Sequence, residues 1–323
     1  MMDWTTPACR YFLRGFSPQI LLYTEMINAR AILRGDRDRL LDYDREEHPL
    51  ALQLGGSEPG ELAAAARAGV EHGYDEINLN CGCPSDRVAS GAFGACLMLE
   101  PRRVADCVAA MVAAVRVPVT VKMRIGVIAG RGAQMRESVS GFTAEDAEAL
   151  AAFIDGVRGA GAAAVIIHAR KAVLGGLSPK ENREVPPLRY EIARDMKQRF
   201  AGLPVVLNGG LRDVAAVREA LSWCDGVMLG REAYHRPWLL AELHTALFAS
   251  ADEAPPSRAT VLERMAGYAE RALAQGQRLP EITRHMLGLY AGLPGAREYR
   301  RLLSEGSRVP GAGASLLRQF AMV

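Results

Sequence analysis

Residues 76–88 read EINLNCGCPSDRV, a short apolar run followed at once by a turn rich in glycine and proline. Such a run, bounded by turn residues, predicts a β-strand that ends near Asn80. Similar runs recur along the chain, each followed by Gly, Asn, Arg or His and then by an alanine-rich helical stretch; they span residues 21–26, 50–56, 119–124, 165–170, 205–210 and 226–231. This alternation predicts βα units on a parallel sheet.

The helices between these strands have readable ends. Pro59 precedes a helix that should stop at Gly73, Pro101 opens the next, and Thr143 with Asp146 should cap a third. Regular βα repetition over most of the chain is typical of a (β/α)8 barrel or of a doubly wound sheet.

Polar side chains stand at the carboxyl ends of six predicted strands: Gln53, Asn80, Lys122, His168, Asn208 and Arg231. A barrel assembles one active site on its top face in this way. A doubly wound sheet would gather ligand residues at one switch point, with a G-x-G-x-x-G fingerprint after the first strand, and the sequence has no such fingerprint. The pattern therefore favours an α/β (β/α)8 TIM barrel.

A barrel of this kind needs eight strands, and the sequence shows seven. The missing one should precede residue 1, because MMDWT reads like the loop that leaves a strand. We expect a TIM barrel without its first strand, through a start codon placed internally or a real shortening. Such an open barrel would expose the edge strands beside the gap.

The end of the chain differs from the rest in charge. After a linker at FASADEAPPSRAT, residues 248–260, the sequence is helical in pattern and carries ten Arg and five Glu from Pro255 onward, a net +5 that leaves −3 for the preceding residues. Arginine favours forked contacts with phosphate, although a solvated helix face that binds no ligand could have the same arginine content. We expect a barrel domain over residues 1–245 and a helical domain over residues 255–323.

Composition excludes several classes of protein. No run of ~18 apolar residues exists, and the first residues lack the basic and apolar regions of a signal peptide, which predicts a cytoplasmic protein with no membrane contact. Six cysteines in a chain of 323 residues are more typical of free thiols than of a disulfide framework. The six histidines are scattered without the close ligand groups of structural zinc, so no metal is expected.

The last two strands end in NGG, residues 208–210, and GR, residues 230–231. These turns lie where (β/α)8 enzymes commonly bind phosphate through backbone N–H groups. Gly209, Gly210 and Gly230 would let the backbone approach an anion, and Arg231 would supply a forked charge. Tight turns that bind no ligand would have a similar sequence. Together with a wide barrel mouth, however, these two turns suggest a phosphorylated cofactor such as FMN.

Three further side chains could carry chemistry. Lys122 ends a buried strand, so its ammonium needs an anion, such as the reduced flavin ring, to offset desolvation. His168 could donate to the same ring or to the substrate. Cys83, at a strand end above a flavin, could donate a proton opposite a hydride. Cys81 would then be a bystander, and Cys96 would pack in the core.

Several stretches resemble the dihydrouridine synthase family, in particular its A-type subfamily, which acts at positions 20 and 20a of tRNA. The likeness extends from MMDWTTPACRYF to the C-terminal region, and SPKENREVPPL (178–188) and PGAREYRRLLS (294–304) are specific to the subfamily. The family motif begins with a strand and Ala-Pro before the first methionines, which this sequence does not contain. The stretch 126–142 is longer and richer in glycine than expected. It would be a flexible loop over the tRNA or an insertion without a role, and we favour the insertion.

The resemblance implies that FMN, reduced by NADPH, passes hydride to C6 of a flipped-out uridine in the tRNA D-loop, while Cys83 protonates C5. It implies no protein partner. The implied FMN residues are Met1, Met2, Gln53, Lys122, His168, Asn208, Gly209, Gly210, Gly230 and Arg231. Asn80 would contact the target nucleotide, and Arg183, Arg297, Arg300 and Arg301 would hold tRNA phosphates or D-loop bases.

Two alternatives stay open at this point. An FMN barrel acting on a small molecule, such as a dihydroorotate or enoate reductase, would share the barrel residues but have little use for the arginine-rich tail. A tRNA-binding protein that had lost its chemistry would keep the tail, yet it would have no reason to keep Cys83, Lys122, His168 and both phosphate turns.

Overall fold

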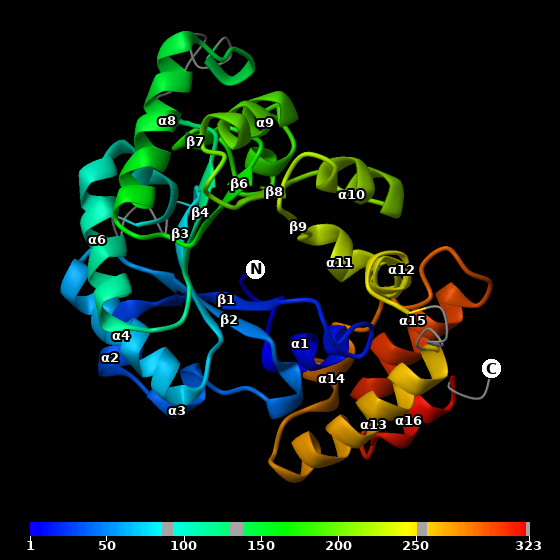
Figure 1. Cartoon of the computed structure of the whole chain (residues 1–323). Helices are drawn as coiled ribbons and strands as arrows, with labels where there is room; N and C mark the ends of the chain where they lie inside the picture. The colour runs from blue at the N-terminus through cyan, green and yellow to red at the C-terminus, as the bar shows by residue number, and fades with distance from the viewer. Residues whose placement is uncertain (86–92, 130–137, 251–256, 321–323) are drawn as a thin grey trace.

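The computed structural model of the chain describes residues 1–85, 93–129, 138–250 and 257–320. Within these residues, seven parallel strands form one curved sheet (Figure 1). Its order is β1 (Leu22–Asn28), β2 (Leu50–Gly55), β3 (Glu76–Cys81), β4 (Val119–Arg124), β6 (Ala164–His168), β8 (Val205–Asn208) and β9 (Gly226–Met228). Each predicted strand is confirmed.

The strand order follows the chain, and helices alternate with the strands, which confirms the TIM-barrel prediction. β1 and β9 are the two edges of the sheet, and no strand in the described part of the chain joins them. Both edge strands are partly exposed, as expected for an open barrel. Figure 1 shows the N-terminus inside the curve of the sheet.

Helices on the outside of the curve cover the sheet, and their ends obey the local signals in the sequence. α4 (Pro59–His72) ends before Gly73, whose φ of 111° is the left-handed conformation that glycine adopts without strain. α6 (Pro101–Ala114) begins with a proline, and Thr143 and Asp146 form a capping box at the start of α8 (Ala144–Gly159). The covering helices are α2 (Ala29–Arg34), α4 (Pro59–His72), α6 (Pro101–Ala114), α8 (Ala144–Gly159), α9 (Tyr190–Arg199) and α10 (Val214–Leu221).

Alternation along β3 and β4 separates an apolar outer face from a polar inner one. Gly69 of α4 lies against Leu52 and Ile77, so these side chains face the helices. Their neighbours Gln53 and Asn78 therefore face the inside of the barrel, because successive side chains of a strand point to opposite faces. The outer face forms a single buried core with the helices, and the inner face carries the polar residues.

The chain after β9 is helical, as predicted. It comprises α11 (Arg231–His235), α12 (Trp238–Leu247), α13 (Arg258–Ala274), α14 (Leu279–Thr283), α15 (Ala296–Glu305), η4 (Gly306–Arg308) and α16 (Ser315–Arg318). The linker residues 251–256 lie outside the described residues, and the boundary between domains at residues 245–255 stays a prediction. No helix in the described ranges is both long and apolar enough to cross a membrane.

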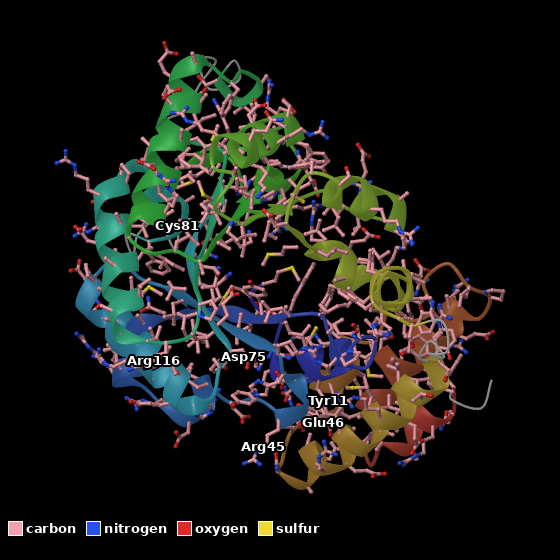
Figure 2. The ribbon with its side chains drawn as sticks, viewed as in Figure 1. Tyr11, Arg45, Glu46, Asp75, Cys81 and Arg116 are labelled. Atoms are coloured by element: carbon pink, nitrogen blue, oxygen red, sulfur yellow. The ribbon has the colours of Figure 1, made fainter. Side chains whose placement is uncertain are left out.

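Helix α1 (Pro7–Arg14) and the short η1 (Arg45–Glu47) connect the barrel with α13. Arg10 forms a buried ion pair with Glu47 at 2.5 Å. Arg264 of α13 pairs with Glu46, and its guanidinium lies 4.2 Å from the centroid of the Tyr11 ring. Tyr11 and Glu46 lie beside each other near the C-terminal helices (Figure 2). These contacts fix the helical region against the open side of the barrel.

A small second sheet lies beyond β4 and β6. β5 (Val127–Ala129) pairs in parallel with β7 (Ala172–Leu174), and η2 (Gly94–Leu99) and η3 (Glu181–Arg183) lie in neighbouring connections. Within the stretch 126–142, residues 130–137 lie outside the described residues, so its proposed lack of a role is untested. The end of this stretch is anchored, because Lys171 Nζ donates to Ser138 O at 3.1 Å and pairs with Asp146 at 2.7 Å.

Candidate active site

The turn that carries Cys83 is held by Asn80. The Oδ1 atom of Asn80 accepts hydrogen bonds from the backbone N–H groups of Gly82 and Cys83, both at 3.0 Å. Its Nδ2 donates to Gln53 Oε1 at 2.8 Å, so residues of β2 and β3 are joined at the mouth of the barrel. The turn is therefore fixed by a side chain whose own orientation is fixed by a neighbouring strand.

The six cysteines are free thiols that occupy different environments. Cys83 is half-buried at the mouth, whereas Cys81 is fully buried among the side chains facing the helices (Figure 2). Burial raises the pKa of the Cys81 thiol, which keeps it protonated and inert. The expectation that Cys96 packs in the core is wrong in part: it is half-buried and donates to Phe93 O at 3.1 Å, because its neighbours Ala95 and Leu97 take the buried face of η2.

Lys122 lies next to Asn80 in the register of β3 and β4. In the part of the chain that the structure describes, its ammonium has no hydrogen-bond or ion-pair partner. Burial, with a smaller effect of the nearby Arg124 charge, lowers the pKa of Lys122 to about 8. Lys122 is half-buried, and a partly shielded cation without an acceptor is a site where an anionic group would gain binding energy.

His168 lies at the carboxyl end of β6, between Arg124 and Asn208 in the register of the sheet. Burial and then the charges of Arg124 and Lys122 hold the pKa of His168 well below its usual value. The imidazole is therefore neutral near pH 7, and it can donate one hydrogen bond and accept another.

Gly209 and Gly210 have φ angles of 112° and 74°, which favour glycine. A Cβ on Gly209 would lie 2.7 Å from His168 Cδ2, and one on Gly210 would lie 2.3 Å from Leu188 Cδ1. Packing within the chain is thus enough to require glycine at both positions. Asn208 donates from Nδ2 to Met228 O at 2.7 Å, which joins β8 to β9.

Gly230 differs from the other two predicted phosphate-turn glycines. Its φ is −118°, and the nearest side-chain atom to a Cβ there would be Met1 Sδ at 3.7 Å, an ordinary contact. Arg231 is not free: it pairs with Glu184 at 2.9 Å and donates to Arg183 O at 3.2 Å. An anion at Arg231 would therefore compete with Glu184.

The two N-terminal methionines have different surroundings. Met1 lies beside Gly230, near the open side of the barrel, and its backbone nitrogen donates to Thr5 Oγ1 at 2.9 Å. Met2 is 57% exposed. Met1 is therefore packed against a residue of the predicted flavin set, whereas Met2 is mostly exposed.

Arg124 is a residue of the site that sequence reasoning missed. Its buried guanidinium donates to the carbonyl oxygens of Gly82 at 3.1 Å, Lys171 at 3.3 Å and Asn182 at 3.0 Å. It thereby ties the Cys83 turn to the segment that carries Arg183. The signal was its position two residues after Lys122, which places both side chains on one face of β4.

The predicted tRNA residues fall into two groups. Arg183 lies near the mouth, close enough to Cys83 and Arg231 for their charges to act on it; burial lowers its pKa, and its Nε atom is buried without a partner. Arg297, Arg300 and Arg301 are exposed on α15, among the C-terminal helices (Figure 1). The structure thus brings Arg183, but not the α15 arginines, to the mouth.

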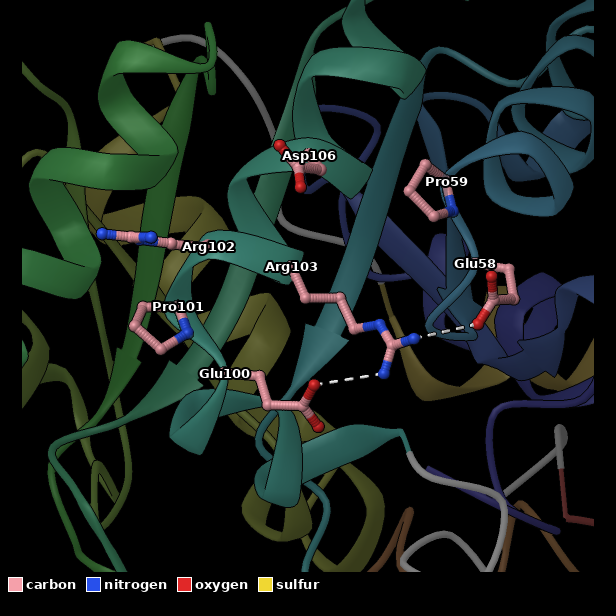
Figure 3. A pocket seen from close by; sticks show the side chains of 7 residues that line it. All are labelled: Glu58, Pro59, Glu100, Pro101, Arg102, Arg103 and Asp106. Atoms are coloured by element: carbon pink, nitrogen blue, oxygen red, sulfur yellow. Dashed lines mark hydrogen bonds and ion pairs between the residues drawn. The ribbon is translucent and has the colours of Figure 1, made fainter.

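A surface pocket of about 640 Å³ lies elsewhere, at the amino ends of α4 and α6 (Figure 3). Arg103 bridges Glu58 at 3.3 Å and Glu100 at 3.1 Å across it. None of the predicted site residues lines it. Its carboxylates would repel a phosphate, so it is not a candidate for the cofactor.

The inner residues at the mouth fit a phosphorylated, electron-accepting ring. Lys122 offers a half-buried charge without a partner in the described residues, His168 offers a neutral donor, and Gln53 offers an amide fixed by its neighbours. Four cationic side chains, of Lys122, Arg124, Arg170 and Arg231, act electrostatically on His168. The excess of positive charge at this end of the barrel favours an anionic ligand.

Comparison with known proteins shows which proteins this chain is similar to. The sequence model of a family described as "Dihydrouridine synthase (Dus)" matches residues 1–322. The tRNA-dihydrouridine(20/20a) synthase of Xanthomonas campestris pv. campestris is 54% identical over 319 residues, which cover 99% of this chain and 90% of that protein. The proteins of the same name from Pseudomonas aeruginosa and Vibrio vulnificus are 55% and 49% identical, over 94% and 99% of this chain and 87% and 93% of their own lengths.

Proposed function

The chain belongs to the dihydrouridine synthase family, and on this premise we propose that it reduces uridine to 5,6-dihydrouridine in the D-loop of tRNA, at positions 20 and 20a. FMN is the bound flavin and NADPH the reductant in this proposal. The observation that carries it is the meeting of two groups at one end of the barrel: the Cys83 turn, held by Asn80, and Lys122, which lies next to Asn80 without a partner of its own in the described residues.

The chain's own residues divide the work of holding FMN. Lys122 and Gln53 would lie against the ring, His168 would donate to it, and the turns at Gly209 and Gly230 would face its phosphate. The remaining residues proposed for this site are Met1, Met2, Asn208, Gly210 and Arg231. To bind the phosphate, Arg231 would have to release Glu184. The Arg231–Glu184 ion pair would therefore break when FMN binds and re-form when it leaves.

FMN, when bound, supplies the hydride that adds to C6 of the uracil ring. Addition at C6 leaves negative charge that spreads over C5 and the C4 carbonyl, and the reaction ends when C5 is protonated. The Cys83 thiol is proposed to donate that proton. Its half-buried position supports this role, because a donor must reach the base while being shielded from water. Asn80 would contact the base and hold the turn at the same time.

The tRNA surface is proposed to comprise Arg183 at the mouth and the exposed row on α15. On this helix Tyr299 and Leu303 are buried, while Arg297, Arg300 and Arg301 face outward and form no ion pair in the described residues. Other arginines of the tail are already engaged, as Arg318 is with Glu263 and Glu270. Free outward arginines favour a polyanion, and a small-molecule reductase would have little use for them.

The domain division at residues 1–245 and 255–323 follows the same assignment, with a flavin barrel and a helical tRNA-binding region. A cytoplasmic location is proposed because tRNA is the substrate.

Two measurements test the proposed function. The purified protein should be yellow, and NADPH should bleach its flavin absorbance. Dihydrouridine should disappear from positions 20 and 20a of tRNA in a deletion strain and return with the gene. A protein that stays colourless after reconstitution with FMN, or a deletion strain with unchanged dihydrouridine, would contradict the proposal.

A further inference from the structure

A continuous row of hydrogen-bonded polar side chains crosses the inside of the barrel beneath the mouth. Thr120 Oγ1 donates to Glu76 Oε1 at 2.6 Å, and Asn78 Nδ2 donates to Thr120 Oγ1 at 2.8 Å. Gln53 Nε2 donates to Asn78 Oδ1 at 2.9 Å, and Asn80 Nδ2 donates to Gln53 Oε1 at 2.8 Å. The row thus joins the amino end of β3 to the residue that holds the Cys83 turn.

The register of the sheet makes this row possible. Asn78 is the register partner of Gln53 on β2 and of Thr120 on β4, so the three side chains stand side by side on the inner face. At the lower end, Tyr23 OH also donates to Glu76 Oε1, at 2.6 Å. Ala51 stands between these two residues in the register, and its small side chain leaves room for the contact.

The two ends of the row determine the direction of every bond in it. Burial raises the pKa of Glu76, and the hydrogen bonds from Thr120 and Tyr23 act against this shift. In its ionised form Glu76 can only accept, so Thr120 must give its single hydrogen to Glu76 and accept from Asn78. At the other end, the backbone N–H groups of Gly82 and Cys83 can only donate, so Asn80 must present its oxygen to them. An amide flipped anywhere between would leave two donors or two acceptors facing each other.

The row is unusual for its position. Branched apolar side chains normally fill the inside of such a barrel. Ile166 on β6 and Val206 on β8 lie in register with Lys122 and so share its inner face. Asn78 is fully buried and Thr120 is 3% exposed, so an incomplete set of hydrogen bonds there would be costly. A buried polar row that is complete, directional and connected to the site indicates a functional reason for its presence.

We propose that Glu76, Thr120 and Asn78 are positioning residues for dihydrouridine formation. They fix the amides of Gln53 and Asn80 in one orientation, and through Asn80 they hold the turn that aims the Cys83 thiol. The inference rests on the proposed function for its effect on catalysis, whereas its effect on the turn can be measured without cofactor or tRNA.

The test replaces Thr120 with Val, which has nearly the same shape but can neither donate to Glu76 nor accept from Asn78. Thr120→Ser restores the hydroxyl. Val121→Ala is the matched control, because Val121 is the buried neighbour on β4 whose side chain faces the helices. Three quantities are measured: hydrogen exchange of the Gly82 and Cys83 amides in flavin-free protein, flavin reduction by NADPH, and single-turnover dihydrouridine formation in tRNA.

In Thr120→Val, the two amides should exchange about fivefold faster or more, because Asn80 no longer holds them in place. Dihydrouridine formation should slow by about tenfold, with flavin reduction within about twofold of the parent protein. Thr120→Ser should restore both quantities, and Val121→Ala should change neither. Unchanged exchange in Thr120→Val, a failure of serine to restore it, or an equal effect of Val121→Ala would overturn the inference.

The test remains decisive if the parent protein is inactive or if Thr120→Val does not fold. If the parent protein forms no dihydrouridine, the proposed function has failed, and the amide exchange still decides whether the row positions the turn. If Thr120→Val does not fold, Glu76→Gln takes its place, because its amide keeps the volume but can donate as well as accept. Faster exchange of the two amides is expected there, and unchanged exchange would overturn the inference.

Discussion

Lys122 and Arg124 stand on the same face of β4, two residues apart, yet Arg124 donates to three backbone carbonyl groups, whereas Lys122 has no partner in the described residues. The guanidinium of Arg124 is thus engaged in hydrogen bonds within the chain, whereas the ammonium of Lys122 remains available to a ligand. The difference separates the two cations by function, and each gives a prediction.

The affinity for FMN should depend on pH through Lys122. The pKa of Lys122 is lowered to about 8, so the ammonium is charged below this pH and an anionic ligand favours that form. Affinity should be nearly constant from pH 7 to 8 and should fall above it, by at most about tenfold per pH unit. Quenching of flavin fluorescence measures this. The Lys122→Met variant should bind FMN weakly, and its affinity should not fall above pH 8. The control Lys180→Met, at an exposed position, should show the same fall as the parent protein. A Lys122→Met protein with the parent's pH profile would contradict the assignment.

Removal of Arg124 should reduce stability. Arg124→Met leaves three carbonyl groups without their donor, and the free energy of unfolding should fall by about 3 kcal/mol. Urea unfolding measures this. Arg116→Met is the control, because Arg116 is exposed and should change stability by less than about 0.5 kcal/mol. Equal stability of the two variants would show that the buried contacts contribute little.

Cys83→Ala should retain FMN and NADPH oxidation but lose most dihydrouridine formation, because only the proton donor is removed. Mass spectrometry of nucleosides from treated tRNA measures the product. Cys96→Ala is the control, since its thiol donates to Phe93 O at 3.1 Å and is not the proposed proton donor. If Cys96→Ala damages product formation more than Cys83→Ala, the assignment of the donor is wrong.

Arg300→Ala should weaken tRNA binding while leaving flavin reduction unchanged. The loss of one phosphate contact should lower the slope of log affinity against log salt by about 0.7 to 0.9. Filter binding at several salt concentrations measures this. The control is Arg318→Ala, a half-buried arginine already paired with two glutamates. An unchanged salt slope in Arg300→Ala would remove α15 from the tRNA surface.

His285 should make stability depend on pH. It is buried, hydrogen-bonded to Thr6 and Tyr234, and its pKa is lowered from 6.5 to about 4 by burial and then by Arg284. Between these values the unfolded chain binds the proton and the folded chain does not, so stability falls as the pH drops from 6.5 to 4. The loss should approach roughly 3 kcal/mol. Urea unfolding of His285→Gln should show less of this dependence, and His72→Gln should keep all of it.

The sequence by itself determined the strands, the helix ends and the face of each strand, because period-two alternation, proline, glycine and capping residues act locally. It also placed Gln53, Asn80, Lys122 and His168 at one end of the barrel, since the carboxyl ends of parallel strands share an edge. Family membership followed from motifs that span the chain.

Only the tertiary structure decided which of these groups are free. The ion pair of Arg231 with Glu184 joins residues 47 positions apart. The contacts of Arg124 with three carbonyl groups span up to 58 positions, and those of the row from Glu76 to Asn80 span up to 44. No local pattern specifies such partners, because they depend on strand register and on how loops return over the mouth. Whether a charged or polar side chain is available for chemistry is a property of its neighbours in space, and the fold supplies them.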